Sequence, residues 1–341
     1  MALRVIHTTT YSYSNPVSVS HTEVHLAPRA DRNQTPLEHR LVVNPLPDSS
    51  IARDDYFGNA VTHFSIHEPH ETLVITSESL VDRHSVEALH PALTPSWEQV
   101  ALEVSRHETS AAFEALEFVF DSPRVAIAPA FAAYAAASFP PGRPILEAAI
   151  DLCHRIFKDF KYDQRATTVT TSIDQVLSKR KGVCQDFAHV MIACLRSRGV
   201  PARYVSGYVH SARQSASAQA SHAWVSAFCP GFGWLDFDPT NDVMPAGRHV
   251  TIAWGRDYSD VPPVKGVALW LARTACIVSV ATVMFAAVAL SVNRSAFAEE
   301  LPPANSTLPV GIGVAVKFTR PPVASRWPVR FWTITGLAGT L

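Results

Sequence analysis

Three residues in the middle of this chain have the types and the order that thiol chemistry needs. Cys184 is followed along the sequence by His222 and then by Asp238. A cysteine nucleophile needs an imidazole within hydrogen-bond reach, and that imidazole needs a third group that fixes its tautomer. Each residue alone is more often structural, but the trio predicts a nucleophile, a general base and an orienting carboxylate.

The nucleophile is expected at the start of a helix. The sequence predicts a helix from about Cys184 to Arg198, because Gly199 suits a helix end and Pro201 follows just beyond it. The first turn of a helix carries partial positive charge, which favours thiolate over thiol. Gly182 allows the chain to enter the helix tightly.

The base and the carboxylate are expected on a β-hairpin. The segment 222–229 alternates in a period of two, the segment 230–233 reads Pro-Gly-Phe-Gly, and a second strand is predicted over 234–238. If the loop has three residues, Cys229 faces Gly233, and Asp238 becomes a diagonal neighbour of His222 at about 7 to 8 Å. A slip of one residue would turn Asp238 to the opposite side of the sheet.

Asp236 competes with Asp238, since both lie on the same predicted face. Asp238 is favoured because Pro239 ends the strand, so that the carboxylate can lie at a rim. On the predicted helix, Asp186 and His189 are rotated away from the nucleophile.

A zinc site is disfavoured by the same helical geometry. Cys184, His189 and Cys194 are spaced at five residues, which scatters them around a helix. The sequence also contains no Gly-rich phosphate loop of standard spacing. No cofactor and no metal are therefore expected.

Composition narrows the class of protein. The 341 residues are 47% hydrophobic, enough for two ordinary domains, and 29 basic residues nearly balance 30 acidic ones. This balance argues against nucleic acid as a partner. The five cysteines are odd in number and lack CxxC spacing, and no apolar leader follows Met1, so a cytoplasmic catalytic region is expected.

The predicted elements define an α+β protein. Residues 1–95 read as a β-rich N-terminal domain, with strands expected over Val17 to Leu26, Leu41 to Val43, Val61 to Ile66 and Leu73 to Ile75. Residues 96–266 form the expected catalytic core. Within it, the sequence predicts two helices in 125–160 separated by a Pro-Pro-Gly break, a strand over 202–209, and a Ser/Ala/Gln-rich loop over 211–221.

The C-terminal part differs in composition. Thr274 to Val292 carries no charged residue, so the region 267–293 is a candidate transmembrane helix, with membrane association through 274–292. A buried helix or strand pair is the alternative, and an internal signal-like segment from a fusion or shifted reading frame is a third explanation. Residues 294–341 are rich in Pro and Gly, and poor order is expected there.

The motifs resemble those of the bacterial branch of the transglutaminase-like superfamily. Gly182-Val-Cys-Gln-Asp-Phe-Ala-His189, His222-Ala-Trp-Val225 and Phe237-Asp-Pro-Thr-Asn241 are similar to the family's nucleophile, base and acid blocks, in the family's order. The opening motifs Tyr11-Ser-Tyr13, His25-Leu-Ala-Pro-Arg29 and Asp55-Tyr-Phe-Gly-Asn59 resemble its β-rich N-terminal region. The resemblance covers roughly residues 1 to 266.

The resemblance implies a fold and an activity. It implies a papain-like core in which a helix carrying Cys184 packs on an antiparallel sheet carrying His222 and Asp238, and it selects Asp238 over Asp236. It further implies attack of a thiolate on a carboxamide and a thioester intermediate. Gln185 or Tyr162 could supply a second oxyanion donor, and neither is assigned.

The expected function is therefore a cysteine-dependent acyl transfer on peptide or protein amides. Hydrolysis, as in a peptidase or amidase, is expected over transfer to an amine. A catalytically silent peptide-binding module of the same fold is the alternative of another class.

Overall fold

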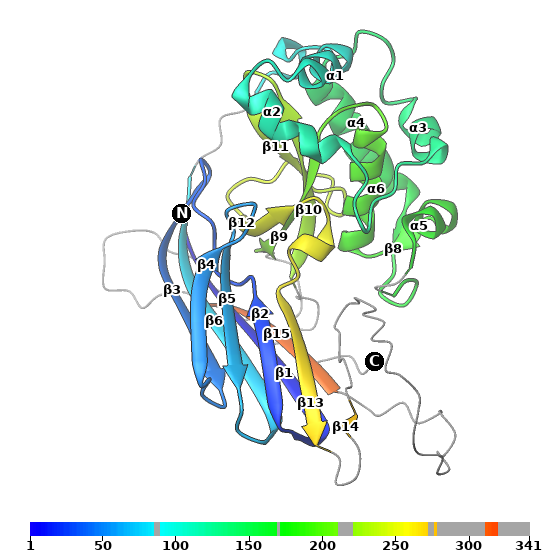
Figure 1. The fold of residues 1–341 in the computed structure, drawn as a ribbon. Helices are drawn as coiled ribbons and strands as arrows, with labels where there is room; N and C mark the ends of the chain where they lie inside the picture. The colour runs from blue at the N-terminus through cyan, green and yellow to red at the C-terminus, as the bar shows by residue number, and fades with distance from the viewer. Residues whose placement is uncertain (85–88, 169–170, 211–220, 272–275, 278–310, 320–341) are drawn as a thin grey trace.

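The computed structural model places a helical part above a β-rich part, with a small sheet between them (Figure 1). The structure describes residues 1–84, 89–168, 171–210, 221–271, 276–277 and 311–319. The mixed helices and antiparallel sheets are the predicted α+β class.

The β-rich part is a sandwich of two antiparallel sheets. One sheet has the order β15-β1-β6-β3 and the other β14-β13-β2-β5-β4. Its strands are β1 (Ala2–Val17), β2 (Val19–Val24), β3 (Gln34–Asn44), β4 (Ser49–Asp54), β5 (Ala60–Ile66), β6 (His70–Arg83), β13 (Val264–Leu271), β14 (Cys276–Ile277) and β15 (Gly311–Thr319). Leu26 and Phe64 meet Leu73 and Ile75 in the core between the sheets. Alternating burial along β6 explains why these residues form strands with one face inward.

The helical part carries the second core. Its helices are η1 (Pro91–Leu93), α1 (Trp97–Arg106), α2 (Ser110–Leu116), η2 (Glu117–Val119), α3 (Pro129–Ala135), α4 (Ile145–Asp159), α5 (Ile173–Lys179), α6 (Cys184–Arg196) and η3 (Tyr258–Asp260). The two helices predicted around the Pro-Pro-Gly break are α3 and α4. In Figure 1, α6 lies beside the small sheet, between α4 and α5. Nearly all of α6 beyond its first turn is buried, which makes this helix the centre of the core.

The sheet between the two parts has the strand order β11-β10-β9-β12. Its strands are β9 (Ala202–Val209), β10 (His222–Cys229), β11 (Gly233–Phe237) and β12 (His249–Gly255), and a two-residue parallel pair joins β7 (Lys161–Tyr162) to β8 (Lys181–Gly182). Cys229 pairs with Gly233, and Val225 pairs with Phe237. The predicted hairpin register is thereby confirmed.

Two predictions concern the C-terminal part of the chain, a membrane span and poor order. No helix within the described ranges is long and apolar enough to cross a bilayer, and apart from β14 the segment 274–292 lies outside those ranges. Poor order remains a prediction for residues 294–341, of which the structure describes 311–319: these form β15, which pairs with the edge of β1 from Arg4↔Thr319 to Ser12↔Gly311. A β-branched run beside an open strand edge is suited to such pairing.

Candidate active site

Cys184 is the first residue of α6, as the sequence predicts. The helix begins after Val183, whose N–H donates to the Asp186 carboxylate at 2.9 Å. Thr167 donates its hydroxyl to the same oxygen at 2.7 Å, so Asp186 fixes the entry to the helix. A Cβ on Gly182 would lie 2.6 Å from this oxygen, which explains the glycine. Burial raises the pKa of Asp186, although these hydrogen bonds oppose the rise.

The helix ends at Arg196, close to the predicted end at Arg198, and the predicted glycine follows it. Gly199 has φ +72°, and the N–H of Val200 donates to the Leu195 carbonyl at 3.1 Å, a pattern typical of a glycine-terminated helix. Arg196 turns back from the last turn and is almost fully buried. The thiol of Cys184 is therefore held at the N-terminus of a helix whose two ends are both fixed.

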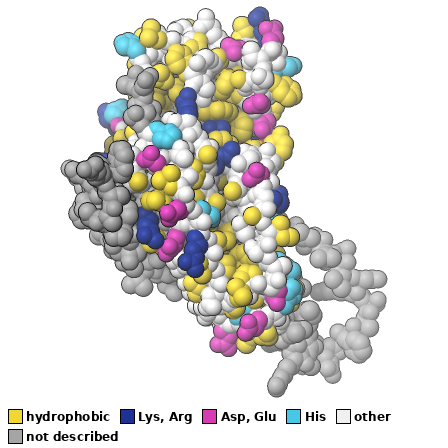
Figure 2. Space-filling model, turned by 90° about the vertical axis from the view of Figure 1, so that its left-hand side faces the viewer, with side chains coloured by type: hydrophobic (Ala, Val, Ile, Leu, Met, Phe, Trp, Pro, Cys, Tyr) yellow, Lys and Arg dark blue, Asp and Glu magenta, His cyan; other side chains and the backbone are white. Residues whose placement is uncertain are grey.

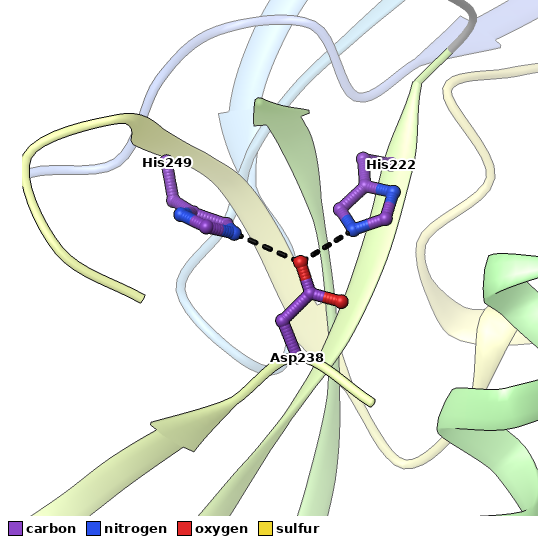
Figure 3. Close-up of side chains that lie close together, drawn as sticks. All are labelled: His222, Asp238 and His249. Atoms are coloured by element: carbon purple, nitrogen blue, oxygen red, sulfur yellow. Dashed lines mark hydrogen bonds and ion pairs between the residues drawn. The ribbon is translucent and has the colours of Figure 1, made fainter. Parts of the chain in front are cut away.

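His222 lies at the start of β10 and makes the central contact of the site. Its Nε2 donates to Oδ2 of Asp238 at 2.8 Å (Figure 3). Because Nε2 carries the proton, Nδ1 is left as the base in the neutral ring. The ring stacks on Trp224 with a centroid distance of 6.2 Å, which fixes its plane.

The pKa of His222 reflects these neighbours. Burial by itself would lower this pKa, but the charges of Asp238 and Cys184 and hydrogen bonding to both raise it to about 10. The imidazole is thus suited to remain protonated opposite a thiolate at neutral pH.

Asp238 is completely buried and saturated with donors. Besides His222, its carboxylate accepts from Nε2 of His249 at 3.0 Å and from Nδ2 of Asn241 at 2.7 Å. The backbone N–H groups of Thr240 and Asn241 also donate to it, at 3.0 and 3.2 Å. Burial alone would raise the pKa of Asp238, but His222 and His249 outweigh it and hold this pKa well below its ordinary value.

His249 is a member of this cluster that the sequence did not predict. It lies at the start of β12, and its ring reaches the same carboxylate oxygen as His222 (Figure 3). Its Nδ1 is buried and finds no partner among the described residues. The sequence signal was weak, since His249 lies on a strand that was not predicted and reaches the site only because β12 pairs with β9.

The other side chains considered in the sequence, Asp236, His189 and Cys194, have structural roles. Asp236 pairs with Ser226 in the ladder and makes no hydrogen bond to His222 in the described part of the chain. His189 is buried and accepts from the N–H of Tyr258 at 3.2 Å, while burial lowers its pKa to about 4. Cys194 is fully buried, and burial raises its pKa to about 12.

The described residues bring together a different set of potential metal ligands from the one considered in the sequence. Ligand atoms of His222, Asp238 and His249 lie within 4.8 Å of one another. Both imidazoles already donate to one carboxylate oxygen, so the set is organised by hydrogen bonds. Of the two oxyanion candidates, Tyr162 pairs with Gly182 beside the helix entry and Gln185 is the second residue of α6.

Comparisons with known proteins agree with this architecture. Residues 3–82 match the bacterial transglutaminase-like N-terminal region, and residues 133–239 match the transglutaminase-like superfamily. The uncharacterized protein Rv2569c of Mycobacterium tuberculosis is 41% identical over 278 residues, which cover 77% of this chain and 86% of that protein. The uncharacterized protein ML0607 of Mycobacterium leprae is 34% identical over 269 residues, covering 78% and 92%. The chain therefore belongs to the bacterial transglutaminase-like family.

Two further proteins are similar to this chain, one over most of its length and one over a short region. A Cytophaga hutchinsonii structure described as a candidate cysteine protease has a TM-score of 0.63 at 21% identity, covering 93% of this chain and 98% of that one. It supports the papain-like fold. A protein-glutamine gamma-glutamyltransferase of Pseudomonas aeruginosa is 37% identical over 100 residues, which cover 26% of this chain and 15% of that protein.

Proposed function

We propose that the protein is a cysteine-dependent acyl-transfer enzyme that acts on peptide or protein amides. One observation carries the proposal: His222 is bonded to a saturated, buried Asp238 and is influenced by a thiol at a helix N-terminus. An imidazole with a raised pKa, oriented by a buried carboxylate and close to a thiol, is the arrangement that an amide-cleaving thiol site needs.

The proposed reaction has two halves. The Cys184 thiolate attacks the amide carbonyl, and protonated His222 gives its proton to the departing amine, which leaves a thioester. In the second half, His222 takes a proton from water, the hydroxide attacks the thioester carbonyl, and the carboxylic acid leaves as the thiolate reforms. Asp238 keeps the imidazole oriented in both halves and stays ionised.

Transfer to an amine is the second candidate, because a region of the chain is similar to a protein-glutamine gamma-glutamyltransferase. The two outcomes differ only in which nucleophile reaches the thioester. A glutamine peptide incubated with a labelled amine separates them: we expect ammonia release or peptide cleavage without label. Incorporation of the amine with no hydrolysed product would replace the hydrolytic proposal with the transferase one.

The proposal that the protein is an enzyme is tested by labelling Cys184 with iodoacetamide, followed by mass spectrometry. We expect rapid labelling at pH 6, where a thiol with an ordinary pKa near 8.5 reacts slowly, and loss of that rate in His222→Ala. Cys153 is the internal control, because it is buried and its pKa is raised by that burial. Slow labelling that His222→Ala leaves unchanged in a folded protein would favour the silent binding module.

A further inference from the structure

A cavity lies at the junction of the helical and β-rich parts, and Cys184 is not among the residues that line it. It measures about 680 Å³ and is bounded by the β4–β5 turn, by α2 and η2, and by residues of β9, β11 and β12. Pockets that hold small ligands commonly measure about 300 to 1,000 Å³. Figure 2 shows this side of the molecule, with hydrophobic side chains over the helical part and Lys and Arg side chains at its junction with the β-rich part.

A buried arginine forms part of this cavity and has no polar partner among the described residues. Arg203 is 9% exposed, and its guanidinium lies 4.2 Å from the Trp234 ring centroid and 3.7 Å from that of Trp254. Within the described ranges no hydrogen bond or ion pair reaches it, and its Nε is buried without a partner. Burial lowers the pKa of Arg203 to about 9, and the charge of Asp236 only partly offsets this effect.

The aromatic contacts restrict what could satisfy Arg203. With Trp234 and Trp254 against the guanidinium, its N–H groups remain available only in the plane of the fork. A planar fork of parallel N–H donors matches a carboxylate, which can accept two hydrogen bonds at once. A buried cation without such a partner is costly, so a carboxylate ligand would remove the cost.

Arg29 shows the contrast within the same cavity. Its guanidinium lies 3.6 Å from the Trp254 ring centroid, but its Nη1 donates to the Phe57 carbonyl at 2.9 Å and to Asn59 Oδ1 at 2.6 Å. Nη1 of Arg29 is therefore occupied by the β4–β5 turn, although its Nε, like that of Arg203, is buried without a partner within the described ranges. Arg29 adds positive charge beside Arg203.

The rest of the lining is aromatic. Phe118 packs edge-to-face on Trp234 at 5.2 Å and lies 5.9 Å from Phe57. Tyr56 and Phe113 are 82% and 65% exposed, so large apolar surface stays open to solvent around the cavity. Exposed aromatic side chains gathered around a cavity favour binding of an apolar or aromatic group.

Two acidic residues also line the cavity and limit the charge that it can accept. Glu114 is exposed, and Glu117 is influenced by the opposite charge of Arg256 and bonds to Tyr56, while burial raises its pKa. These carboxylates repel additional negative charge. A ligand with one carboxylate fits this balance better than a phosphate does.

We propose that this cavity binds a group that carries one carboxylate next to an aromatic ring, with the carboxylate on Arg203 and the ring against the Phe118–Trp234 wall. The site is separate from the thiol site: Arg203 pairs with Ser226 in the middle of β10, whereas His222 pairs with Gly207 at the start of that strand. Four residues of strand separate the two positions by about 13 Å. The proposal does not depend on the activity of Cys184.

The test measures binding to the full chain by isothermal titration calorimetry, with three probes. The probes are N-acetylphenylalanine, its amide, and N-acetylphenylalanyl-glutamic acid α-amide, whose one free carboxylate lies on the glutamate side chain and not at the chain end. We expect one or both acids to bind about tenfold or more tightly than the amide, because only they form the charged pair. Which acid binds identifies a peptide terminus or an acidic side chain as the source.

Variants connect the binding to the cavity. Arg203→Met keeps an unbranched chain between the tryptophans, and we expect it to abolish the preference for acid over amide. Phe113→Ala should weaken both acid and amide, whereas the exposed Arg40→Met should change neither. The proposal is overturned if acid and amide bind equally, if neither binds at millimolar concentration, or if a folded Arg203→Met retains the preference. If Arg203→Met does not fold, the comparison of acid with amide and the Phe113→Ala result decide.

Discussion

The buried charges of Asp238 and Arg203 lie on one face of the sheet β11-β10-β9-β12, but their surroundings differ. The cross-strand pairs place Arg203 and Asp236 opposite Ser226. Asp238 follows Asp236 by two positions and His222 precedes Ser226 by four, so both lie on this same face. Asp238 receives hydrogen bonds from two imidazoles, an amide and two backbone groups. Arg203 receives aromatic faces and no acceptor from the described residues.

The difference teaches how burial can serve two purposes. A saturated buried carboxylate stays ionised and orients its donors, so its position is fixed before any substrate arrives. A buried guanidinium with free N–H groups carries an energetic cost that a ligand can remove. The first arrangement suits chemistry and the second suits recognition.

The largest expected effect comes from removing the charge of Asp238, the carboxylate that is saturated with hydrogen-bond donors. In Asp238→Asn, His222 loses its ionised partner while its ring stays buried, so we expect its pKa to fall from about 10 to 6.5 or below. The Cys184 thiol then loses its imidazolium, and labelling at pH 6 should slow by about two to three orders of magnitude. Histidine NMR titration and iodoacetamide kinetics measure the two changes.

Asp236→Asn is the matched control for this variant. It removes the same charge from the same face, two residues earlier, where no hydrogen bond to His222 is present within the described ranges. Labelling should stay near the wild-type rate. Equal losses in Asp236→Asn and Asp238→Asn would mean that general charge, and not the bond to His222, controls the thiol.

The next comparison concerns two buried arginines. Arg196 donates to the carbonyls of Ala202, Phe120 and Arg256 and to Ser122 Oγ. Arg203 makes no such bonds in the part of the chain that the structure describes. Arg196→Met leaves these acceptors unsatisfied, and we expect the free energy of unfolding to fall by about 3 to 5 kcal/mol. Arg203→Met should change it by about 1 kcal/mol or less, because desolvation relief offsets the lost stacking.

Equilibrium urea unfolding of the two variants beside the wild type checks this contrast. Similar losses for both arginines would show that stacking between tryptophans stabilises Arg203 as well as hydrogen bonds stabilise Arg196. Arg203 would then be a structural residue in the absence of ligand.

Local patterns in the sequence predicted the elements that hold the three candidate residues. The helix starting at Cys184 follows from its neighbouring glycine and apolar run, and the register of Cys229 with Gly233 follows from a short turn. Helix α1 was missed although its capping box, Ser96 with Gln99, was present in the sequence.

Contacts that depend on sheet order could not be predicted in the same way. His249 reaches Asp238 only because β12 joins the far side of β9, which no local pattern encodes. The sandwich of Arg203 between Trp234 and Trp254 likewise needs three strands in a particular order. Similarly, β15 pairs with β1 from the opposite end of the chain.

The smallest expected effect tests His249 as a positioning residue. His249→Phe keeps the ring volume but removes one donor from Asp238, so the carboxylate is held less firmly and we expect labelling of Cys184 to slow about tenfold. The pKa of His222 should stay raised, because Asp238 keeps its charge and shares it with one donor fewer. A simple loss of structure would instead lower that pKa.

His249→Gln provides the rescue for this variant. Its side-chain amide can still donate to Oδ2, so the labelling rate should recover towards the wild type, while the phenylalanine variant stays slow. If phenylalanine and glutamine slow the reaction equally, the shape of the ring matters and the donated hydrogen bond does not. If neither slows it, the remaining donors to Asp238, from Asn241 and the backbone of Thr240, suffice to hold the carboxylate in place.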